Sequence, residues 1–409
     1  MSNVYSILKE RGFIEQVTDE VALPQKLTSS ITCYAGFDPT ADSLHVGHLL
    51  PIMALAQMQR AGHRPVVLVG GGTAMIGDPS GKNEMRKIMT REEIEANARK
   101  IKEQFSSYIN FSGDKAALLL NNAAWLTPVK YIDFLRDVGR HFSVNRMIAA
   151  ESYKARLETG LNFIEFNYML LQAYDFLHLF REHGCVLQLG GNDQWGNIVA
   201  GIDLIRRVTA ESSFGLTFPL ITTASGAKMG KTEQGAIWLD PELTAPYDYY
   251  QYWINTDDRD VERFLAYFTF LSMEEINALF ADGNSHIRRN KEILAFEATK
   301  ITHGEEAAVK AREGARALFE GNAGVLDSVP TTEIARKRIS EGIAAFILFE
   351  ETKLSGTRSE ARRLIKDGGG YVNNVRIRTF DEMISEKHVK DNVILLRAGK
   401  KKYHRIVVK

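Results

Sequence analysis

The sequence predicts a doubly wound, Rossmann-like α/β domain, followed by a helical domain and a small α+β domain. Three observations support this prediction. Short apolar runs alternate with helical stretches over the first 240 residues, an aromatic-rich helical pattern follows from Pro246, and basic residues gather after residue 350. At 409 residues, the chain is too long for a single hydrophobic core. Its 44% hydrophobic and 25% charged residues are typical of a globular protein.

Four apolar runs are expected to form the strands of the first domain. They lie in residues 31–37, 64–78, 116–125 and 185–191. Helical stretches separate them, and one begins with a Thr90/Glu93 capping box. Apolar strands alternating with helices predict a parallel sheet that is covered on both faces. Such sheets bind ligands at the carboxyl ends of their strands. We therefore expect the site in the loops after Phe37, Gly77 and Gly191.

The rest of the chain divides by composition into a helical part, a linker and a basic tail. The expected boundaries are 1–240 for the α/β domain, 241–325 for the helical domain, 326–340 for the linker and 341–409 for the tail. The tail begins with a helix that carries a Thr357/Glu360 capping box. Two hairpin-like pieces follow it, "YVNNVRI" and "VILLRAGKKKYHRIVVK".

The formal net charge of zero conceals a segregation of charge along the chain. Residues 351–409 hold fifteen Lys and Arg against seven Asp and Glu, a net charge of +8, so residues 1–350 carry −8. A basic module of this kind is typical of proteins that bind a polyanion. Charge alone is equally compatible with a solvated basic surface.

The composition also favours one cellular compartment. The first residues lack the apolar core of a signal peptide, and no stretch approaches the ~18 apolar residues of a membrane helix. Cys33 and Cys185 are the only cysteines, which suits a reducing compartment and argues against a cysteine-based metal site. We expect a cytoplasmic protein that does not enter a membrane.

The segment "DPTADSLHVGH" places two histidines where a strand gives way to a helix. A helix N-terminus leaves backbone N–H groups unpaired and attracts phosphate. His45 and His48 share one face, Gly47 leaves room for a flat group, and Thr40 adds a hydroxyl. A single histidine is more often a cap or a core residue, but the whole pattern favours a phosphate site.

Two details of this helix are predicted as well. Ser43 is expected to be its N-cap. Pro51 would then lie inside the helix, where proline removes the hydrogen bond to the carbonyl of Gly47 and favours a kink.

A second phosphate site is predicted in "SGAKMGKT", where Lys228 and Lys231 lie in a polar, glycine-containing loop. Alone, this loop would be interpreted as a solvated basic loop. Together with HVGH, it resembles the two signature sequences of class I aminoacyl-tRNA synthetases, HIGH and KMSKS.

Further motifs extend the resemblance along essentially the whole chain. "YAGFDPTADSLHVGH", "IGDPSGKNEMR", "NYMLLQAYD" and "GGNDQWGN" resemble those of bacterial-type tyrosyl-tRNA synthetases, and the basic tail resembles an S4-type RNA-binding domain. The departures are Val46 for Ile and Gly230 for Ser in the signatures, with Ala35 and Pro51 at positions that line the nucleotide.

The helix "FIEFNYMLLQAYDFLHLF" supports a binding pocket independently of the resemblance. Tyr168, Gln172 and Asp175 form a narrow polar stripe at i, i+4 and i+7, opposite a broad apolar face. Most such stripes face solvent. This one contains no Lys or Arg and lies between leucines, so we expect it to form a pocket wall.

The resemblance implies that the protein activates L-tyrosine with ATP and transfers the tyrosyl group to tRNA(Tyr). It implies Mg²⁺ carried by ATP, no protein-bound metal, and a homodimer with its interface around residues 125–165. The implied tyrosine-binding residues are Tyr34, Asp78, Tyr168, Gln172, Asp175 and Gln194. The implied ATP-binding residues are Gly36, Asp38, Gly47, Gly191, Asp193 and Lys231. The implied catalytic residues are Thr40, His45, His48, Lys82, Arg86, Lys228, Lys231 and Thr232.

Three alternatives share part of this pattern. A tryptophanyl-type synthetase would not need a Tyr/Asp pair for a phenol, and a small-molecule nucleotidyltransferase would have no use for the basic tail. A non-catalytic RNA-binding protein derived from a synthetase should have lost signature residues, which are all present here.

Overall fold

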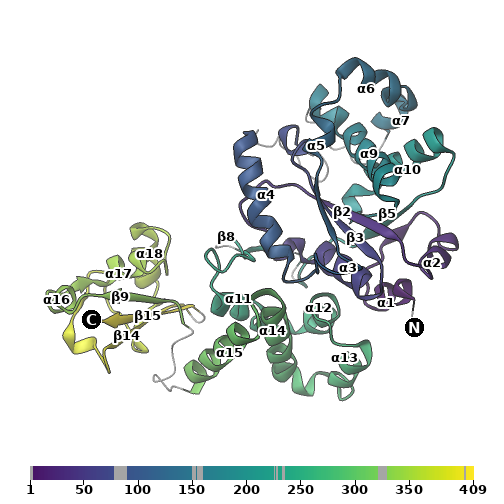
Figure 1. Ribbon diagram of the computed structural model, residues 1–409. Helices are drawn as coiled ribbons and strands as arrows, with labels where there is room; N and C mark the ends of the chain where they lie inside the picture. The colour runs from purple at the N-terminus through teal and green to yellow at the C-terminus, as the bar shows by residue number, and fades with distance from the viewer. Residues whose placement is uncertain are drawn as a thin grey trace. The chain divides into compact units, whose positions relative to one another are not determined.

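A computed structural model of the protein describes residues 3–77, 90–149, 153, 160–224, 226, 229–232, 235–320, 329–399 and 402–409 (Figure 1). The chain forms two compact units, one made of residues 1–240 with 257–287 and the other of residues 241–256 with 288–409. Residues 257–287, expected in the helical domain, thus belong to the first unit. In the described part of the chain, no helix is both long and apolar enough to span a bilayer.

The first unit is built on a six-stranded sheet with the order β1-β6-β5-β2-β3-β4. All neighbouring strands are parallel except β1, which is antiparallel to β6, so the predicted doubly wound parallel sheet is confirmed. The strands are β1 (Gln16–Val17), β2 (Thr32–Phe37), β3 (Arg64–Val69), β4 (Leu118–Asn121), β5 (Cys185–Gly191) and β6 (Phe214–Phe218). The chain passes outward from β2 to β3 and from β5 to β6, so a topological switch point lies between β2 and β5.

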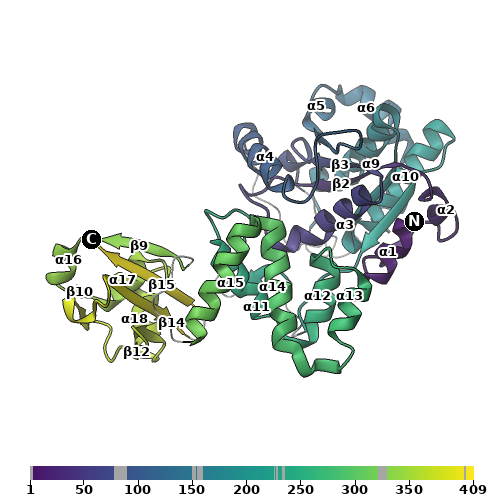
Figure 2. The ribbon, with the colours of Figure 1, turned by 60° about the horizontal axis from the view of Figure 1, so that its bottom comes forward.

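Helices cover this sheet. The long helix α9 (Phe163–His183) packs beside α10 (Trp195–Thr209), and their apolar side chains form one core with those of β2 and β3 (Figures 1 and 2). Helix α3 (Leu49–Arg60) contacts β2, β3, α1 (Val4–Glu10) and α12 (Val261–Phe268). The remaining helices of this unit include α2 (Ala22–Lys26), α4 (Arg91–Phe105), α5 (Ala123–Leu126), α6 (Tyr131–Asp137), α7 (Val144–Ile148) and α13 (Met273–Leu279). The Thr90/Glu93 capping box predicted for α4 is confirmed.

The start of α3 differs from the prediction. Ser43 is not the N-cap, because a short 3₁₀ turn, η1 (Val46–His48), precedes α3 and His45 caps that turn. Since α3 begins only at Leu49, Pro51 occupies its first turn, where no intrahelical N–H bond is needed. The expectation that Pro51 lies in the helix interior and kinks it is therefore wrong.

The second unit combines three helices, α11 (Pro246–Ile254), α14 (Ile287–His303) and α15 (Glu305–Glu320), with the tail. The tail forms a five-stranded sheet with the order β12-β11-β14-β15-β9. Its strands are β9 (Thr331–Ile334), β11 (Gly370–Val372), β12 (Val375–Arg376), β14 (Val393–Ala398) and β15 (Lys402–Val408). A separate two-stranded pair joins β10 (Ile343–Ala344) to β13 (Met383–Ile384). The tail helices are α16 (Arg336–Ser340), α17 (Ala345–Glu351) and α18 (Arg358–Lys366).

The two predicted hairpins of the tail are present. β11 and β12 pair antiparallel around Asn373 and Asn374, which both have positive φ, and β14 pairs antiparallel with β15. Thr357 caps α18 by accepting from the Glu360 N–H, but the Glu360 carboxylate bonds the N–H of Gly356 rather than that of Thr357. Strand β9 lies within the expected linker of residues 326–340, yet it pairs with β15 of the tail sheet. We therefore draw the start of the tail before Thr331.

Candidate active site

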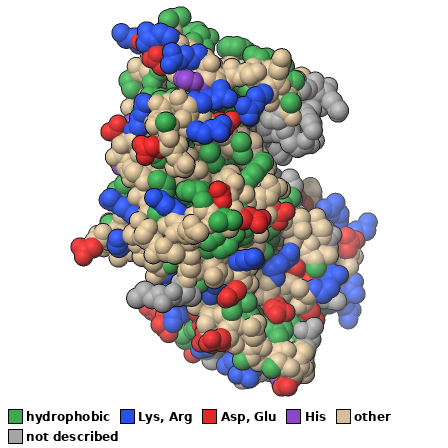
Figure 3. Space-filling view, turned by 90° about the vertical axis from the view of Figure 1, so that its right-hand side faces the viewer, with side chains coloured by type: hydrophobic (Ala, Val, Ile, Leu, Met, Phe, Trp, Pro, Cys, Tyr) green, Lys and Arg blue, Asp and Glu red, His purple; other side chains and the backbone are tan. Residues whose placement is uncertain are grey.

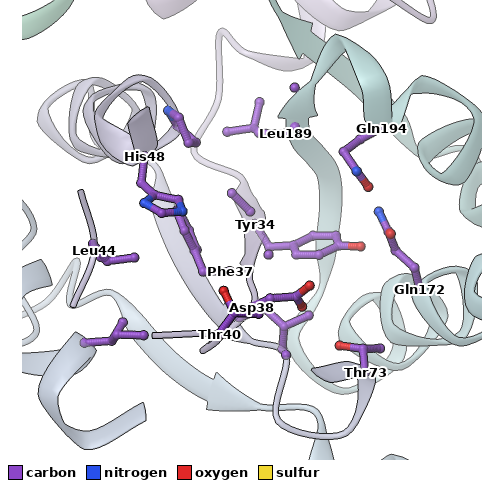
Figure 4. Close-up of a pocket in the computed structure, with 18 of the residues that line it drawn as sticks. Tyr34, Phe37, Asp38, Thr40, Leu44, His48, Thr73, Gln172, Leu189 and Gln194 are labelled. Carbon is purple, nitrogen blue, oxygen red and sulfur yellow. The ribbon is translucent and has the colours of Figure 1, made fainter. Parts of the chain in front are cut away.

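A cavity of about 590 Å³ opens at the carboxyl ends of β2, β3 and β5, beside the switch point (Figure 4). The position matches the expected ligand site of a doubly wound sheet. Twelve of the site residues implied by the resemblance line it, from segments far apart in the chain. They are Tyr34, Gly36, Asp38, Thr40, His45, His48, Tyr168, Gln172, Asp175, Gly191, Asp193 and Gln194.

Of the other site residues singled out in the sequence, the structure describes Gly47 and the backbone of Lys231 and Thr232. Gly47 lies behind the His45 ring, so close that an added Cβ would be 2.7 Å from it. Lys231 and Thr232 form strand β7, of which the structure describes the backbone alone. Asp78, Lys82, Arg86 and Lys228 lie outside the described residues.

His45 and His48 form a reciprocal cap. His45 Nδ1 accepts from the Gly47 N–H at 3.0 Å, and the His45 N–H donates to His48 Nδ1 at 3.1 Å, with the rings 4.1 Å apart. The alternative interpretation from the sequence, that these histidines act as helix caps, is therefore also correct. Because both bonds use Nδ1, the cap does not employ Nε2 of either ring.

The reciprocal cap contradicts the prediction that free backbone N–H groups at this helix start bind phosphate. The Val46 N–H donates to the Ile237 carbonyl at 2.9 Å, and the N–H groups of Gly47 and His48 both bond to His45. The helix start thus does not offer the unpaired backbone N–H groups that the sequence analysis expected. A phosphate at this edge must be held mainly by side chains.

The two signature segments lie against each other. Residues 44–46 pair antiparallel with residues 237–239: the Leu239 N–H donates to the Leu44 carbonyl at 2.8 Å, and His45 bridges Trp238. Gly230 packs on Gly47, where an added Cβ would lie 2.8 Å from the backbone nitrogen, and its φ is +94°. A serine here would clash and be strained, which explains Gly230 in place of the usual Ser.

The polar stripe of α9 faces the cavity, as predicted. Tyr168 and Asp175 are buried, and Tyr168 Oη donates to Asp38 Oδ1 at 3.4 Å. Asn197 of α10 donates to the amide oxygens of both Gln172 and Gln194, at 3.0 and 3.1 Å. Figure 4 shows Gln172 and Gln194 on the same side of the cavity as the Tyr34 ring tip.

Asp175 is held by two donors that the sequence analysis missed. Asn122 Nδ2 donates to Oδ2 at 2.8 Å and Trp125 Nε1 donates to Oδ1 at 2.7 Å. Burial raises the pKa of Asp175 to about 7, while these two hydrogen bonds act in the opposite direction and the charge of Asp38 adds to the increase. Asn122 follows β4, so its place at a strand's carboxyl end was a signal that could have identified it.

Two neighbouring side chains direct buried polar atoms to this cavity. Tyr34 on β2 and Gln188 on β5 are register partners, and both line the cavity. Among the described residues, none hydrogen-bonds to Tyr34 Oη or Gln188 Oε1, although both atoms are buried. Burial, and next the charge of Asp175, raise the pKa of Tyr34 well above its usual value. Because buried polar atoms normally have a partner, this pair marks a binding site for a polar ligand group.

The opposite end of the cavity is open and contains glycines. Nothing lies within 4 Å of a Cβ added at Gly36, so its backbone faces free space. At Gly191, a Cβ would lie 2.5 Å from Asp193 Oδ1, so glycine is required for the Asp193 side chain to lie there. This end can admit a flat, bulky group with a carboxylate beside it. Among the described residues, no group of three or more His, Cys, Asp or Glu is arranged to hold a metal ion.

The sheet, the cavity at its switch point and the paired signature segments define a class I aminoacyl-tRNA synthetase. Two family models match the chain: residues 25–320 match "tRNA synthetases class I (W and Y)", and residues 322–406 match the "Tyrosine--tRNA ligase SYY-like C-terminal domain". The chain belongs to the tyrosyl-tRNA synthetase family.

Individual relatives agree with this assignment. The chain is 59% identical to the tyrosine–tRNA ligase of Desulfatibacillum aliphaticivorans over 99% of each chain, and 55% identical to that of Caldanaerobacter subterraneus over 100% of each. A C-terminally truncated mitochondrial tyrosyl-tRNA synthetase of Aspergillus nidulans superposes with a TM-score of 0.71 at 31% identity, covering 78% of this chain and 95% of that one. A tryptophanyl-tRNA synthetase from Encephalitozoon cuniculi, 15% identical with a TM-score of 0.55, shares the fold.

Proposed function

We propose that this chain activates L-tyrosine with ATP, forming tyrosyl-adenylate and pyrophosphate, and then transfers the tyrosyl group to tRNA(Tyr). The observation that carries the amino-acid assignment is the buried Tyr34 hydroxyl near the Asp175 carboxylate, at the closed end of the cavity. A phenol can donate to a carboxylate and accept from a hydroxyl, whereas an indole has no acceptor. The cytoplasm remains the expected compartment.

The remaining polar groups of the closed end suit the α-amino end of tyrosine. Tyr168 and Gln172 hold this group together with Asp78, as the family resemblance implies, and Gln194 lines the same pocket. Asn197 supports this role because it bonds the oxygens of Gln172 and Gln194 and so fixes both amides.

The first step needs positioning and charge stabilisation more than proton transfer. The carboxylate of tyrosine is already ionised and attacks the α-phosphate of ATP, which brings its own Mg²⁺. Thr40 and His45 meet the γ-phosphate, while Lys82, Arg86, Lys228 and Lys231 neutralise the leaving pyrophosphate. Since the backbone N–H groups at the start of η1 are already paired, these side chains carry the phosphate binding.

The open end of the cavity suits the nucleoside part of ATP. Gly191 and Asp193 meet the ribose, and the exposed backbone of Gly36 lies against the nucleotide. The absence of a side chain at Gly47 lets Gly230 of the second signature segment approach His45. Asp38 contributes its backbone near the α-phosphate.

The S4-like tail binds tRNA. The basic side chains of α18 are exposed and form one broad face of the helix: Arg358, Arg362, Arg363 and Lys366. The Arg362 guanidinium lies 4.2 Å from the centre of the Phe346 ring. Exposed basic side chains bind phosphates without reading the sequence, and Arg–aromatic pairs offer a stacking surface for bases.

A homodimer is the assembly that the surface of the first unit supports. Large apolar side chains are exposed on α6, α7 and the start of α9: Tyr131, Ile132, Leu135, Val144, Ile148, Phe163 and Ile164. Ile132 and Phe163 are 70% and 68% exposed. Figure 3 shows green apolar side chains beside blue basic ones near the top of the molecule, where α6 and α7 lie. Exposed apolar side chains gathered in one region are typical of protein interfaces.

ATP–pyrophosphate exchange with each of the twenty amino acids tests the proposed reaction. Tyrosine should support exchange far better than phenylalanine or tryptophan. Only its phenol can both donate to the Asp175 carboxylate and accept from the Tyr34 hydroxyl. Exchange with tryptophan instead, or no exchange with any amino acid, would overturn the proposal.

A further inference from the structure

The loop of residues 38–45 connects β2 to η1 and carries Asp38, Thr40 and His45 of the proposed phosphate site. It lies outside any helix or strand. Within the loop, the Thr40 N–H donates to the Asp38 carbonyl at 2.8 Å. A loop with so little regular structure takes its position mainly from the elements that touch it.

Helix α4 touches this loop along one face. Asn97 Nδ2 donates to the Pro39 carbonyl at 3.0 Å, and two turns later Gln104 reaches the other end of the loop. Ile101 lies between them, buried, and lines the cavity. The Lys100–Asp42 ion pair, 3.0 Å long, is well exposed and therefore contributes little.

Gln104 makes the contact nearest to His45. Its Oε1 accepts from the Leu44 N–H at 2.9 Å, which is the main contact. Ser43 Oγ lies 3.3 Å from the same oxygen and shares its single hydrogen with the Leu44 carbonyl at 2.8 Å. Ser43 and Leu44 are buried, and Ser43 Oγ also accepts from the Asp240 N–H at 3.3 Å. One side-chain oxygen thus joins α4 to the point where the first signature segment pairs with the residues after the second.

We propose that Gln104 is a positioning residue for adenylate formation. It fixes the backbone of Ser43 and Leu44, and through them it sets where Thr40 and His45 meet the phosphates of ATP; this role rests on the proposed function. Because the phosphate site is built from side chains on an irregular loop, a shift of the loop end that Gln104 holds displaces those groups. Asp38, which accepts from Tyr168 of the tyrosine pocket, lies at the other end of the loop, so the pocket is affected less. Misplacement by about 1 Å can lower a rate by roughly 10²-fold.

The chemistry of the contact suggests matched variants. Both bonds use Gln104 as an acceptor, so Gln104→Glu keeps them and Gln104→Leu removes them at nearly constant volume. Gln59 is a suitable control, because it makes the same kind of side-chain bridge to the backbone of Asn110, at 2.8 and 2.7 Å, away from the cavity. Gln59→Leu reports what the loss of such a bridge does to stability alone.

The test measures single-turnover adenylate formation and ATP–pyrophosphate exchange on the full chain. Gln104→Leu should lower kcat by about 10- to 100-fold and leave KM for tyrosine near the wild-type value. Gln104→Glu should restore kcat at saturating ATP, and Gln59→Leu should retain wild-type kcat. Wild-type kcat in Gln104→Leu, or equal losses in Gln104→Leu and Gln59→Leu, would overturn the inference.

Two further outcomes are decisive. If Gln104→Leu does not fold, Gln104→Met tests the same contact, since it also lacks the acceptor oxygen but keeps an unbranched side chain of similar length; it should lower kcat in the same direction, and an unchanged kcat would refute the role. A wild-type chain without any exchange activity would refute the proposed function itself, and the inference with it.

Discussion

Tyr34→Phe should make the free protein more stable and less selective at the same time. The Tyr34 hydroxyl is buried with the ring 1% exposed, and no described residue hydrogen-bonds to it. Phenylalanine keeps the ring, which packs 5.3 Å from that of Phe176, and removes only the hydroxyl. The variant therefore isolates one polar atom.

The magnitude follows from the cost of burying a hydroxyl without a partner, about 1–3 kcal/mol. Relief of part of this cost should raise the free energy of unfolding by about 1 kcal/mol. With tyrosine bound, the hydroxyl gains a partner worth about 0.5–1.5 kcal/mol, so kcat/KM for tyrosine should fall about 2- to 12-fold. kcat/KM for phenylalanine should hardly change, because phenylalanine offers no partner. Tyrosyl-tRNA synthetases as a family discriminate between the two amino acids by about 10⁵, so this one hydroxyl accounts for only a small part of the total.

Two assays suffice: urea unfolding of the free protein, and kcat/KM for both amino acids by pyrophosphate exchange. Tyr267→Phe is the matched control, since Tyr267 is also buried but its hydroxyl donates to the Gly12 carbonyl at 3.0 Å. That variant should lose about 0.5–1.5 kcal/mol of stability and keep its selectivity. A destabilised Tyr34→Phe with an unchanged tyrosine-to-phenylalanine ratio would refute the orientation proposed for the pocket.

Five other predictions follow from the structure. The pKa of Asp175 is about 7 in the folded protein, against about 4 in the unfolded chain. Between about pH 4 and 7, the folded state therefore binds a proton that the unfolded state has lost, so the free energy of unfolding falls as the pH rises. Asp175→Asn should flatten this decline, as measured by urea unfolding at several pH values. In wild type, protonation of Asp175 removes its charge, so the ratio of kcat/KM for tyrosine to that for phenylalanine should decrease below about pH 7. Lys231→Ala should lower the single-turnover rate of adenylate formation far more than it weakens ATP binding; weak binding at an unchanged rate would indicate a simple tether. A chain ending at residue 320 should retain pyrophosphate exchange and lose tRNA charging, whereas equal loss of both would misplace the active site; truncation at 340 is less suitable because β9 would lose its partner β15. Ile132→Asp, on the exposed apolar face, should shift the protein toward monomer in sedimentation experiments, and an unchanged mass would place the interface elsewhere.

Local patterns in the sequence determined the class of fold and most of the tyrosine pocket. Apolar runs of four to seven residues predict β2, β3, β4 and β5 because the strands of a sheet covered on both faces consist mainly of apolar residues. The spacing of Tyr168, Gln172 and Asp175 predicts one face of α9, because the helical repeat alone brings them together. These inferences need only neighbours within a few residues.

Tertiary structure decided how each of those groups is held. Asn122 and Trp125 bond to Asp175 across about fifty residues of sequence, and Gln188 becomes the neighbour of Tyr34 only through the register of two strands. No local pattern encodes a pairing between segments so far apart, because it depends on the order in which strands assemble into the sheet.

The start of α3 shows the same division in one place. The sequence by itself determined that HVGH opens a helix at the edge of the sheet. Only the folded chain decided that His45, not Ser43, is the cap. Residues 237–239 pair with residues 44–46, and the Val46 N–H donates to the Ile237 carbonyl. Ser43 is then held by Gln104 and Asp240 instead. A hydroxyl and an imidazole can each cap a helix, and the choice between them depends on which other groups the fold brings to the same donors.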